Sequence, residues 1–478
     1  MGGNRGVKAG RSGSGASKAR KATPAPGASA PSRPLREDLV RALALEAYAA
    51  IRDEGRVADR TLDFLLRRER RLYAQERRAV AEAVYGMLRA EGRLDFLLER
   101  GLGRGVLETL GRPARQALYY EAWRVLERRV PPARALAEGG LSAALLPGLL
   151  ACAQPGPFLA ELAGDPVRRL AVEESLPAWM ARLFVAELGD EGAFALARSM
   201  NERAPLTLRV NRLKTDRDGL LRALRDEGVE AVPTRWSPDG VTVRSRQNLF
   251  QLRAFRDGLF EIQDEGSQLL AQLLDPHPGW TVVDACAGAG GKTLALAASM
   301  RNRGRLVALD TEPQRLEKLA PRARRAGVHN WEAHVVAPEG VPPELERRLA
   351  GTADAVLIDA PCSGLGVLRR NPDARFRLDE GSVARFACIQ RDLLARYAAL
   401  ARPGGRIVYA TCSVAREEDE DVVEAILAAH PELELVPPSE TLGAELAERL
   451  GAERYLRLLP HRHGTDGFFA ALLRRKAA

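Results

Sequence analysis

Apolar residues recur every three or four positions from residue 35 to residue 165, as Val80, Val84 and Leu88 do. This period places the apolar side chains on one face of a helix. The Arg-Pro pair at 112–113 can open a further helix, because proline is tolerated in the first turn of a helix. The pattern therefore predicts an all-helical domain over residues 35–165.

The pattern changes after residue 165. Residues 166–200 keep the helical period, whereas 206–210 and 241–243 alternate apolar and polar residues as strands do. Between these strands, the amphipathic stretch 216–227 is followed by a glycine, which is typical of a helix that ends there. We expect a helical linker and then a small α/β module within residues 166–265.

From residue 266 to residue 478, short apolar strands alternate with longer helical stretches. The strand candidates are residues 281–284, 306–310, 355–359 and 406–410. The helical stretches lie at about 292–301, 312–326, 382–401 and 417–429. This alternation is typical of an α/β doubly wound sheet, in which ligands bind at the carboxyl ends of the strands.

Residues 139–160 carry no charge and are long enough to raise the question of a membrane span. Three prolines, Pro147, Pro155 and Pro157, interrupt this stretch. Proline lacks the backbone N–H that a helix interior needs, so a single spanning helix is disfavoured. We expect a buried helix pair with a loop, and no membrane partner.

The chain has 478 residues and a net charge of +9, which is unevenly placed. Residues 1–34 hold seven Lys and Arg residues and no acid, so the rest of the chain carries only about +2. Because this segment is rich in Gly, Ser, Ala and Pro, we expect a disordered basic tail. Any nucleic-acid surface on the remainder must be a local patch. One candidate is the arginine run at 67–78, which is either a solvated helix face or a face for RNA phosphates.

The chain has five cysteines, and no two of them are spaced as CxxC: Cys152, Cys286, Cys362, Cys388 and Cys412. An odd number without metal-ligand spacing argues against a disulfide framework and against a metal site. Free thiols fit a reducing compartment. We expect a cytoplasmic, monomeric protein.

A glycine-rich turn, residues 284–293, follows the strand candidate 281–284. Glycines at such a turn let a ligand approach the backbone, and twenty residues after Gly290 the next strand ends at Asp310. A carboxylate there can accept both hydroxyls of a ribose, so the pair indicates a nucleotide-type ligand. The end of the turn also resembles a P-loop, but that pattern requires glycine where this chain has Cys286. A nucleotide triphosphatase is therefore the weaker interpretation.

Two cysteines stand at strand ends, Cys362 after the strand that ends at Asp359 and Cys412 after the strand that ends at Ala410. Neighbouring strands would bring both thiols to one crevice. Buried cysteines are usually small hydrophobes, but polar strand ends are not core positions. A thiolate that adds to carbon 6 of cytosine makes carbon 5 nucleophilic, which is chemistry that needs a cysteine. Asp359 is placed to act as the acid near ring nitrogen 3, although this chemistry does not say which cysteine attacks.

Arginines are dense after Cys362, where Arg369, Arg370, Arg375 and Arg377 fall within nine residues. One interpretation is contact with a phosphate backbone, which makes Arg369, Arg370 and Arg375 candidate RNA-binding residues. The other is a solvated loop.

Several motifs resemble those of the RNA cytosine-C5 methyltransferases, the family that includes the NOL/NOP/SUN proteins and the bacterial small-subunit rRNA methyltransferase B. The motifs are Pro205-Leu-Thr-Leu-Arg209-Val-Asn211, Phe260-Glu-Ile-Gln263-Asp264-Glu-Gly-Ser267-Gln268, the turn 284–293, Asp359-Ala-Pro-Cys362-Ser-Gly, Arg369-Arg370-Asn-Pro-Asp373, Ala410-Thr-Cys412-Ser and Asp466-Gly467-Phe468-Phe469. The resemblance covers residues 200–475, and its two-cysteine signature is the most specific part.

The resemblance implies that Cys412 attacks carbon 6 and that Cys362 assists proton removal and product release. It implies S-adenosylmethionine as the cofactor, held by Asp310, Asp359 and the turn residues Cys286, Ala287, Gly288, Ala289, Gly290, Gly291 and Lys292. Enzymes that act on DNA attack from a Pro-Cys motif, so the Thr-Cys pair favours RNA over DNA.

The resemblance also implies an architecture. Residues 35–165 look like the NusB-type RNA-binding domain that precedes a Rossmann-like methyltransferase domain, here residues 266–478. That order points to small-subunit (16S) rRNA as the substrate and partner. A tRNA cytosine-C5 methyltransferase and a non-catalytic RNA-binding ribosome assembly factor are the alternatives.

The chain departs from the family pattern at several positions. Residues 287–289 read Ala-Gly-Ala where Ala-Ala-Pro is common, and the stretch 334–339 has no clear counterpart of the acid that usually lies near the adenine. Phe376 replaces a usual Trp, and Leu365 a usual Thr. Backbone contacts of the turn should survive these changes.

Overall fold

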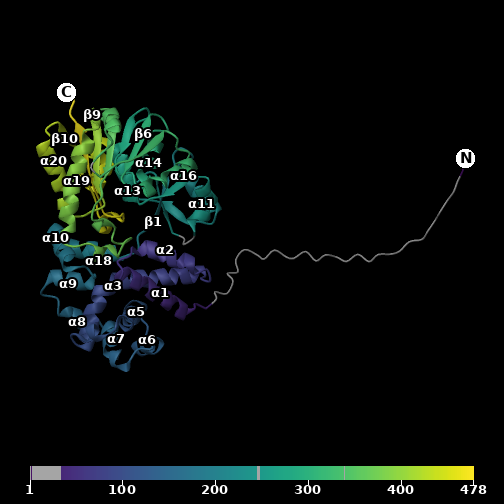
Figure 1. Ribbon diagram of the computed structural model, residues 1–478, viewed down its shortest axis with the longest axis vertical. Helices are drawn as coiled ribbons and strands as arrows, with labels where there is room; N and C mark the ends of the chain where they lie inside the picture. The colour runs from purple at the N-terminus through teal and green to yellow at the C-terminus, as the bar shows by residue number, and fades with distance from the viewer. Residues whose placement is uncertain (1, 3–33, 245–247, 339, 478) are drawn as a thin grey trace.

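The computed structural model folds the chain into two lobes, a helical lobe and a lobe built on a large sheet (Figure 1). It describes residues 2, 34–244, 248–338 and 340–477. The expected disordered tail, residues 1–34, therefore lies outside the described residues except for Gly2 and Pro34.

The described part of residues 35–165 is helical, as the pattern predicts. Its elements are α1 (Glu37–Arg52), α2 (Ala58–Arg68), α3 (Ala74–Leu102), α4 (Val106–Thr109), α5 (Arg112–Arg128), α6 (Pro132–Glu138), η1 (Ala143–Leu145), α7 (Leu146–Ala153) and α8 (Gly156–Ala160). The helix α3 contributes Val80, Val84 and Leu88 to the core, where they have no exposed surface. Helices α1, α5 and α7 pack against α3, and this packing holds the lobe together.

The uncharged stretch 139–160 forms η1, α7 and α8 rather than one long helix. Helix α7 packs against α3 and buries Leu149 and Cys152. Helix α8 has no fully buried residue, so the expectation of a buried helix pair holds for α7 and is wrong for α8. None of the helices in the described ranges is long and apolar enough to cross a membrane.

Two helices, α9 (Pro166–Glu173) and α10 (Ala178–Asn201), lead from the helical lobe into a small module. The module contains β1 (Leu206–Val210), α11 (Arg217–Asp226), β2 (Ala231–Pro233), β3 (Gly240–Val243), η2 (Leu249–Gln251), α12 (Arg253–Arg256) and β4 (Phe260–Ile262). Its strands pair antiparallel in the order β2-β3-β1-β4. The expected strands and helix are present, and β2 and β4 are additions that the pattern does not predict.

The second lobe is built on an eight-stranded sheet. Its strands are β5 (Thr281–Asp284), β6 (Arg305–Asp310), β7 (Trp331–Val335), β8 (Ala353–Asp359), β9 (Ala401–Thr411), β10 (Leu433–Val436), β11 (Leu456–Leu458) and β12 (Phe468–Arg475). They are ordered β10-β12-β9-β8-β5-β6-β7, with β11 paired to β12. The run from β7 to β9 is parallel, and the C-terminal strands are antiparallel. The four predicted strands are β5, β6, β8 and β9 at the centre, as expected for a doubly wound fold.

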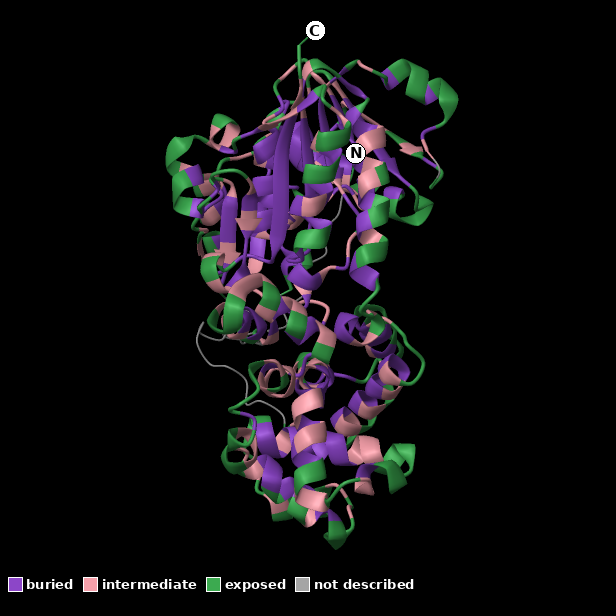
Figure 2. Cartoon of the chain, turned by 90° about the vertical axis from the view of Figure 1, so that its left-hand side faces the viewer, coloured by how far each residue is buried: buried purple, intermediate pink, exposed green. Residues whose placement is uncertain are grey.

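Helices cover both faces of this sheet, and Figure 2 shows the strands buried between them. The elements are α13 (Glu265–Leu274), α14 (Gly291–Ser299), α15 (Pro313–Leu316), α16 (Leu319–Ala326), α17 (Pro343–Leu349), η3 (Leu365–Val367), α18 (Ala374–Arg377), α19 (Ser382–Ala398), η4 (Arg416–Glu418), α20 (Glu420–Ala429), α21 (Ser439–Leu442), α22 (Ala444–Leu450) and α23 (Pro460–His463). Helices α13, α14 and α16 share one core with the sheet, and α17, α19 and α20 share another.

One predicted helix is broken. The stretch 312–326 forms α15 and α16, separated at Glu317 and Lys318. Pro321 explains the break, because its ring excludes the carbonyl of the residue four positions earlier and offers no N–H to it. The single-helix expectation is therefore wrong at this point.

Candidate active site

A cavity of about 630 Å³ opens at the carboxyl ends of the central strands, where a doubly wound sheet binds ligands. The glycine-rich turn, Asp310, Asp359, Cys362 and Cys412 all line it. Two apolar side chains of α19, Ile389 and Leu393, form another part of the wall. The structure thus brings together the residues predicted for the cofactor and those predicted for thiol chemistry.

The glycine-rich turn joins β5 to α14 and needs glycine at specific positions. Gly288 and Gly290 adopt positive φ angles of 56° and 83°, which favour glycine. A Cβ on Gly290 would lie 2.2 Å from a side-chain carbon of Leu319, so the turn can pack against α16 only without a side chain. The backbone of the turn therefore faces the cavity at close range.

Asp310 stands at the end of β6 beside this turn. One carboxylate oxygen accepts the N–H of Gly288 at 2.7 Å, and the other accepts the N–H of Glu312 at 2.8 Å. Each oxygen has a second lone pair, so the carboxylate can still accept the hydroxyls of a ribose. This geometry fits the predicted contact.

Two groups at the turn have raised pKa values: Asp284, which has no exposed surface, and Cys286, which is partly exposed. Asp284 accepts a hydrogen bond from the Thr293 hydroxyl at 2.6 Å, and burial raises the pKa of Asp284 to about 7. Burial also raises the pKa of the Cys286 thiol well above its ordinary value. A protonated Cys286 is a poor nucleophile, which agrees with its role as a small residue of the turn.

Lys292 places a positive charge between the cofactor turn and the cysteines. Its Nζ lies 2.6 Å from a carboxylate oxygen of Asp359. Burial disfavours the ammonium form, but the charge of Asp359 outweighs burial and raises the pKa of Lys292. Lys292 is also near enough to Cys412 for the two to interact electrostatically. The site therefore contains a Lys–Asp pair, whereas the sequence pattern suggested Asp359 alone.

The two strand-end cysteines meet because β8 and β9 are adjacent and parallel, with Asp359 aligned to Ala410. The sulfur atoms of Cys362 and Cys412 lie 3.2 Å apart. The Cys412 backbone N–H also points to the Cys362 sulfur, at 3.3 Å. The hydrogen bond with Cys412, together with burial, raises the pKa of Cys362 well above its ordinary value. Cys362 thus keeps its proton and can donate it to a hydrogen bond with Cys412.

A glycine contact holds the backbone around Cys412. The N–H of Gly366 donates to the Cys412 carbonyl at 2.8 Å, and the N–H of Gly467 donates to the Gly366 carbonyl at 2.8 Å. A Cβ on Gly366 would lie 2.3 Å from the Gly467 oxygen. Only glycine therefore allows these three segments to meet.

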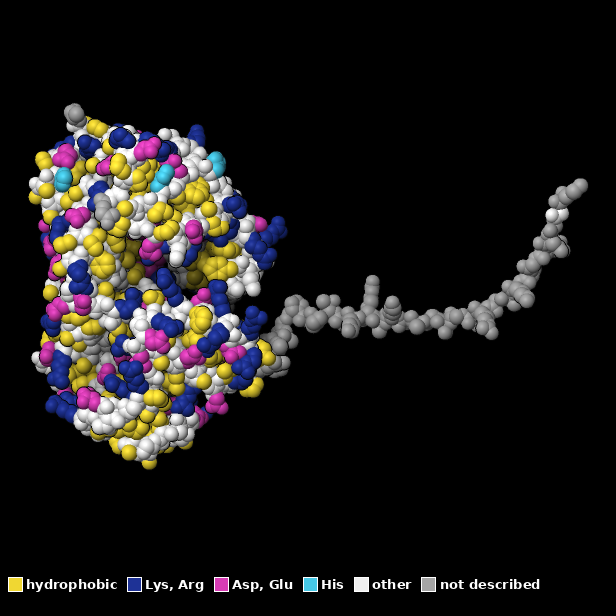
Figure 3. Space-filling view, viewed as in Figure 1, with side chains coloured by type: hydrophobic (Ala, Val, Ile, Leu, Met, Phe, Trp, Pro, Cys, Tyr) yellow, Lys and Arg dark blue, Asp and Glu magenta, His cyan; other side chains and the backbone are white. Residues whose placement is uncertain are grey.

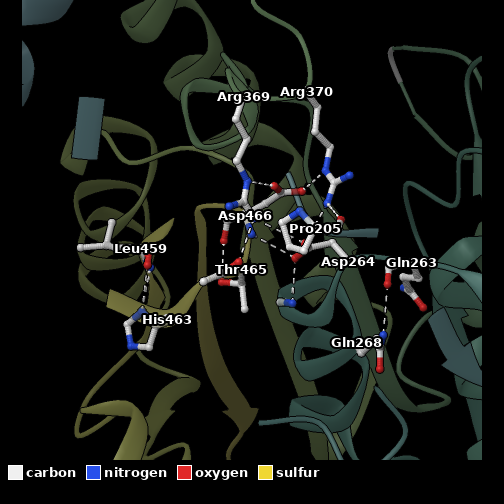
Figure 4. Close-up of polar contacts among 12 residues, drawn as sticks. Pro205, Gln263, Asp264, Gln268, Arg369, Arg370, Leu459, His463, Thr465 and Asp466 are labelled. Atoms are coloured by element: carbon white, nitrogen blue, oxygen red, sulfur yellow. Dashed lines mark hydrogen bonds and ion pairs between the residues drawn. The ribbon is translucent and has the colours of Figure 1, made fainter. Parts of the chain in front are cut away.

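The arginines that follow Cys362 do not form an open RNA-binding loop, and Figure 4 shows two of them turned toward Asp264 and Asp466. Arg369 is 5% exposed and donates to Asp466 at 2.6 Å. Arg370 bridges Asp466 and Asp264, at 3.0 Å from the latter.

Arg375 is more deeply buried than Arg369 and Arg370. It is 1% exposed and donates to the Ser175 carbonyl and to Asn201, both at 3.0 Å. The structure therefore contradicts the prediction that Arg369 and Arg375 contact RNA, because their guanidinium groups are buried and bonded to protein. Arg370 is partly exposed, but its donors are engaged in the same network.

The other arginine-rich segment, at 67–78, lies at the surface of the helical lobe. Arg67, Arg68 and Arg71 pair with Asp63, Glu46 and Glu69, respectively. Figure 3 shows basic and acidic side chains interspersed over the visible face. These pairs are typical of a solvated helix face, which was one of the two interpretations.

The sequence pattern did not predict how the small module supports the cofactor turn. Arg209 of β1 is buried and donates to the Gly291 carbonyl at 2.7 Å. Arg322 of α16 donates to the Ala289 carbonyl at 2.6 Å and pairs with Glu261 of β4. Arg209 belongs to a motif of the sequence resemblance, but only the fold shows that its partner is the turn.

Comparisons with known proteins agree with this architecture. Residues 271–474 match the family 16S rRNA methyltransferase RsmB/F, and residues 176–249 match the Methyltr_RsmF/B-like, ferredoxin-like domain. The probable ribosomal RNA small subunit methyltransferase B of Bacillus subtilis is 31% identical over 454 residues, which cover 92% of this chain and 100% of that protein. Ribosomal RNA small subunit methyltransferase B of Sodalis glossinidius is 30% identical, over 90% of this chain and 96% of that one.

Solved structures show the same fold. The structure of PH0851 matches with a TM-score of 0.70 at 29% identity, over 90% of this chain and 98% of that one. A methyltransferase homolog protein from Pyrococcus horikoshii matches with a TM-score of 0.53 at 28% identity, over 65% of this chain and 98% of that one.

The doubly wound sheet, its cavity and these matches define an S-adenosylmethionine-dependent methyltransferase. Within that class, the chain belongs to the 16S rRNA methyltransferase RsmB/F family.

Proposed function

We propose that this chain transfers a methyl group from S-adenosylmethionine to carbon 5 of a cytosine in small-subunit rRNA, through a covalent adduct of Cys412 at carbon 6. The observation that carries the proposal is the pair of thiols, 3.2 Å apart, on the wall of the cavity that the cofactor turn also lines. A pyrimidine ring at this wall would lie within reach of both sulfurs.

Electrostatics favours Cys412 as the nucleophile. Cys362 holds its proton, because its pKa is raised, and can donate a hydrogen bond to a Cys412 thiolate. The ammonium of Lys292 is near enough to Cys412 for the two to interact electrostatically. This argument is independent of the family resemblance and reaches the same assignment.

The proton at ring nitrogen 3 is assigned to the Lys292–Asp359 pair. Lys292 lies 2.6 Å from Asp359, whose charge raises the pKa of Lys292, so Lys292 is the protonated member of the pair. After methyl transfer, the carbon 5 proton must leave and the bond between Cys412 and carbon 6 must break. Cys362, beside Cys412, is the group assigned to assist this release: its thiol protonates the departing Cys412 sulfur, and the Cys362 thiolate so formed accepts the carbon 5 proton as the double bond between carbons 5 and 6 reforms.

The cofactor supplies the methyl group as a sulfonium. We assign its binding to Asp310, to Asp359 and to the turn residues 286–292. Their backbone groups, the free lone pairs of Asp310 and the apolar side chains of α19 fit a nucleoside bearing a positive charge.

The substrate assignment comes from the relatives, which are named as small-subunit ribosomal RNA methyltransferases. We assign residues 35–165 as a NusB-like RNA-binding domain, residues 166–265 as the linker and small module, and residues 266–478 as the methyltransferase domain. A transcript of small-subunit rRNA and a tRNA transcript, offered side by side, separate the rRNA and tRNA alternatives by which one accepts methyl groups.

The central test compares cysteine variants with radiolabelled S-adenosylmethionine and rRNA. Cys412→Ala should abolish methyl transfer, whereas Cys362→Ala should accumulate an RNA adduct that survives a denaturing gel. Cys388→Ala is the matched control, because Cys388 is exposed on α19 and should leave turnover unchanged. An adduct in Cys412→Ala but not in Cys362→Ala would reverse the assignment. Wild-type protein that binds rRNA without methylating it would instead favour a non-catalytic assembly factor.

A further inference from the structure

A single buried carboxylate joins the two cysteine loops. A serine follows each cysteine, Ser363 after Cys362 and Ser413 after Cys412, and both serines bond to Glu418. One oxygen of Glu418 accepts the Ser363 backbone N–H at 2.8 Å. The other accepts the hydroxyls of Ser363 and Ser413, the latter at 2.5 Å. The two loops are therefore held by one side chain.

Burial of this carboxylate costs free energy, and hydrogen bonds must offset that cost. Glu418 has no exposed surface, and within residues 34–244, 248–338 and 340–477 no lysine or arginine forms an ion pair with it. Its charge is satisfied by hydrogen bonds alone, including one from the Gln390 amide at 3.1 Å. The short helix η4 that carries Glu418 is tied to β9, because the Tyr409 hydroxyl donates to the Glu418 carbonyl at 2.5 Å. The carboxylate is thus fixed to the strand that ends at Cys412.

We propose that Glu418 is a positioning residue, which sets the separation and orientation of the Cys362 and Cys412 sulfurs by clamping the serine beside each of them. This role rests on the proposed function, because it concerns the two thiols of that reaction. The charge of Glu418 also contributes to the raised pKa of Cys362, after the hydrogen bond with Cys412 and burial. The carboxylate therefore helps to keep the proton on Cys362.

The first test replaces Glu418 by glutamine, which keeps the shape but removes the charge and places an amide N–H₂ against its donors. We expect kcat to fall by about 100-fold, as for a misplacement of reacting groups by about 1 Å, with the KM for rRNA unchanged. Because the charge raises the pKa of Cys362, its removal should move the alkaline limb of the pH–rate profile to lower pH. Glu418→Asp keeps the charge and should restore the position of that limb.

Glu417→Gln is the matched control, because it changes the exposed neighbouring carboxylate and should leave kcat and the pH profile unchanged. Cofactor binding and the thermal unfolding midpoint report whether each variant is folded. A folded Glu418→Gln protein with wild-type kcat and pH profile would overturn the proposal. Absence of methyl transfer by the wild type would instead contradict the proposed function.

The second test separates the two arms of the clamp. Ser413→Ala loosens the loop of the nucleophile, so RNA adduct should form more slowly. Ser363→Ala loosens the loop of Cys362, so adduct should form at the normal rate but accumulate on a denaturing gel. Both variants keep Glu418 and are expected to fold even if Glu418→Gln does not. Equal adduct kinetics in the wild type and both serine variants would overturn the clamp.

Discussion

Two arginine-rich segments look alike in the sequence and are used in opposite ways. At 67–78 the arginines other than Arg77 are exposed, and Arg67 and Arg71 bond to carboxylates four and two residues away. At 369–377 the buried Arg369 and Arg375 have partners far along the chain, 97 and 200 residues away, although the half-exposed Arg377 pairs with Asp373 four residues before it. The buried, distant partners of Arg369 and Arg375 therefore distinguish a structural junction from a solvated helix face, and the density of arginine does not.

The two arginine-rich segments should also differ in how much their ion pairs contribute to stability. An exposed ion pair gains little, because water screens it and the side chains lose freedom. A buried pair has already lost its hydration, so removal of one partner leaves an uncompensated charge. Substitutions at 369–377 and its partners should therefore cost much more stability than substitutions at 67–78.

The largest effect is expected for Asp466→Ala. Asp466 is 2% exposed and bonds to both Arg369 and Arg370, so its loss leaves two guanidinium groups without their main partner. We expect the free energy of unfolding to fall by about 3–5 kcal/mol, measured by urea denaturation. A loss below about 1 kcal/mol would mean that the two segments do not differ in this way.

The next effect is expected for Arg375→Met, which keeps the aliphatic packing and removes the guanidinium. The Ser175 carbonyl and the Asn201 amide oxygen then lose a donor in a buried place. We expect a loss of about 2 kcal/mol in the free energy of unfolding. Arg385→Met is the control, because the Arg385 side chain is 62% exposed and pairs with Asp379, which is 68% exposed, so its loss should stay below about 1 kcal/mol.

The contrast between local patterns and contacts made only in the folded protein also explains how much of the fold the sequence predicts. The central strands β5, β6, β8 and β9 are apolar and end in polar residues, so the pattern finds them. The edge strand β7, Trp-Glu-Ala-His-Val, alternates apolar and polar residues as a half-buried strand does, but it is short and has no continuous apolar run, so the strand candidates chosen for their apolar runs leave it out. Strand β12 contains Ala, Leu and Arg, which favour helices, and only its place between β9 and β10 makes it a strand.

In the candidate site, too, some residues could be predicted from local patterns and others could not. Cys362 and Cys412 could be predicted to meet, because each follows an apolar strand. Glu418 could not be predicted, because it lies in the charged run 416–421, which reads as exposed. Its burial depends on Ser363, which lies 55 residues earlier in the chain. Contacts of this length follow from the fold and are not visible in local patterns.

A smaller effect should appear as opposite pH dependences in the two segments. Burial and the charge of Asp466 raise the pKa of Asp264 to about 6, whereas the hydrogen bond from Arg71 lowers that of Glu69 to about 2. Stability from protonated Asp264 is therefore complete below pH about 4 and is lost as the pH rises through about 6. Asp264→Asn cannot titrate, so its stability should decline less steeply than that of the wild type between about pH 4 and 6.

Glu69→Gln is the comparison for that measurement. Because the pKa of Glu69 is lowered, its contribution is present above pH about 4 and is lost as the pH falls toward about 2. The two variants should therefore change the pH–stability curve at opposite ends. An Asp264→Asn curve parallel to the wild type between pH 4 and 6 would contradict the burial argument.

The smallest effect is expected for Arg67→Ala. The Arg67 side chain is 79% exposed and pairs with Asp63 on the same helix, so the free energy of unfolding should change by less than about 0.5 kcal/mol. Because this arginine already has a local partner, the dependence of rRNA affinity on salt concentration should keep its slope. A slope smaller by about one unit would show that Arg67 contacts a phosphate, since each such contact releases about one counterion. The segment at 67–78 would then be an RNA-binding face, and the two arginine-rich segments would differ in function as well as in burial.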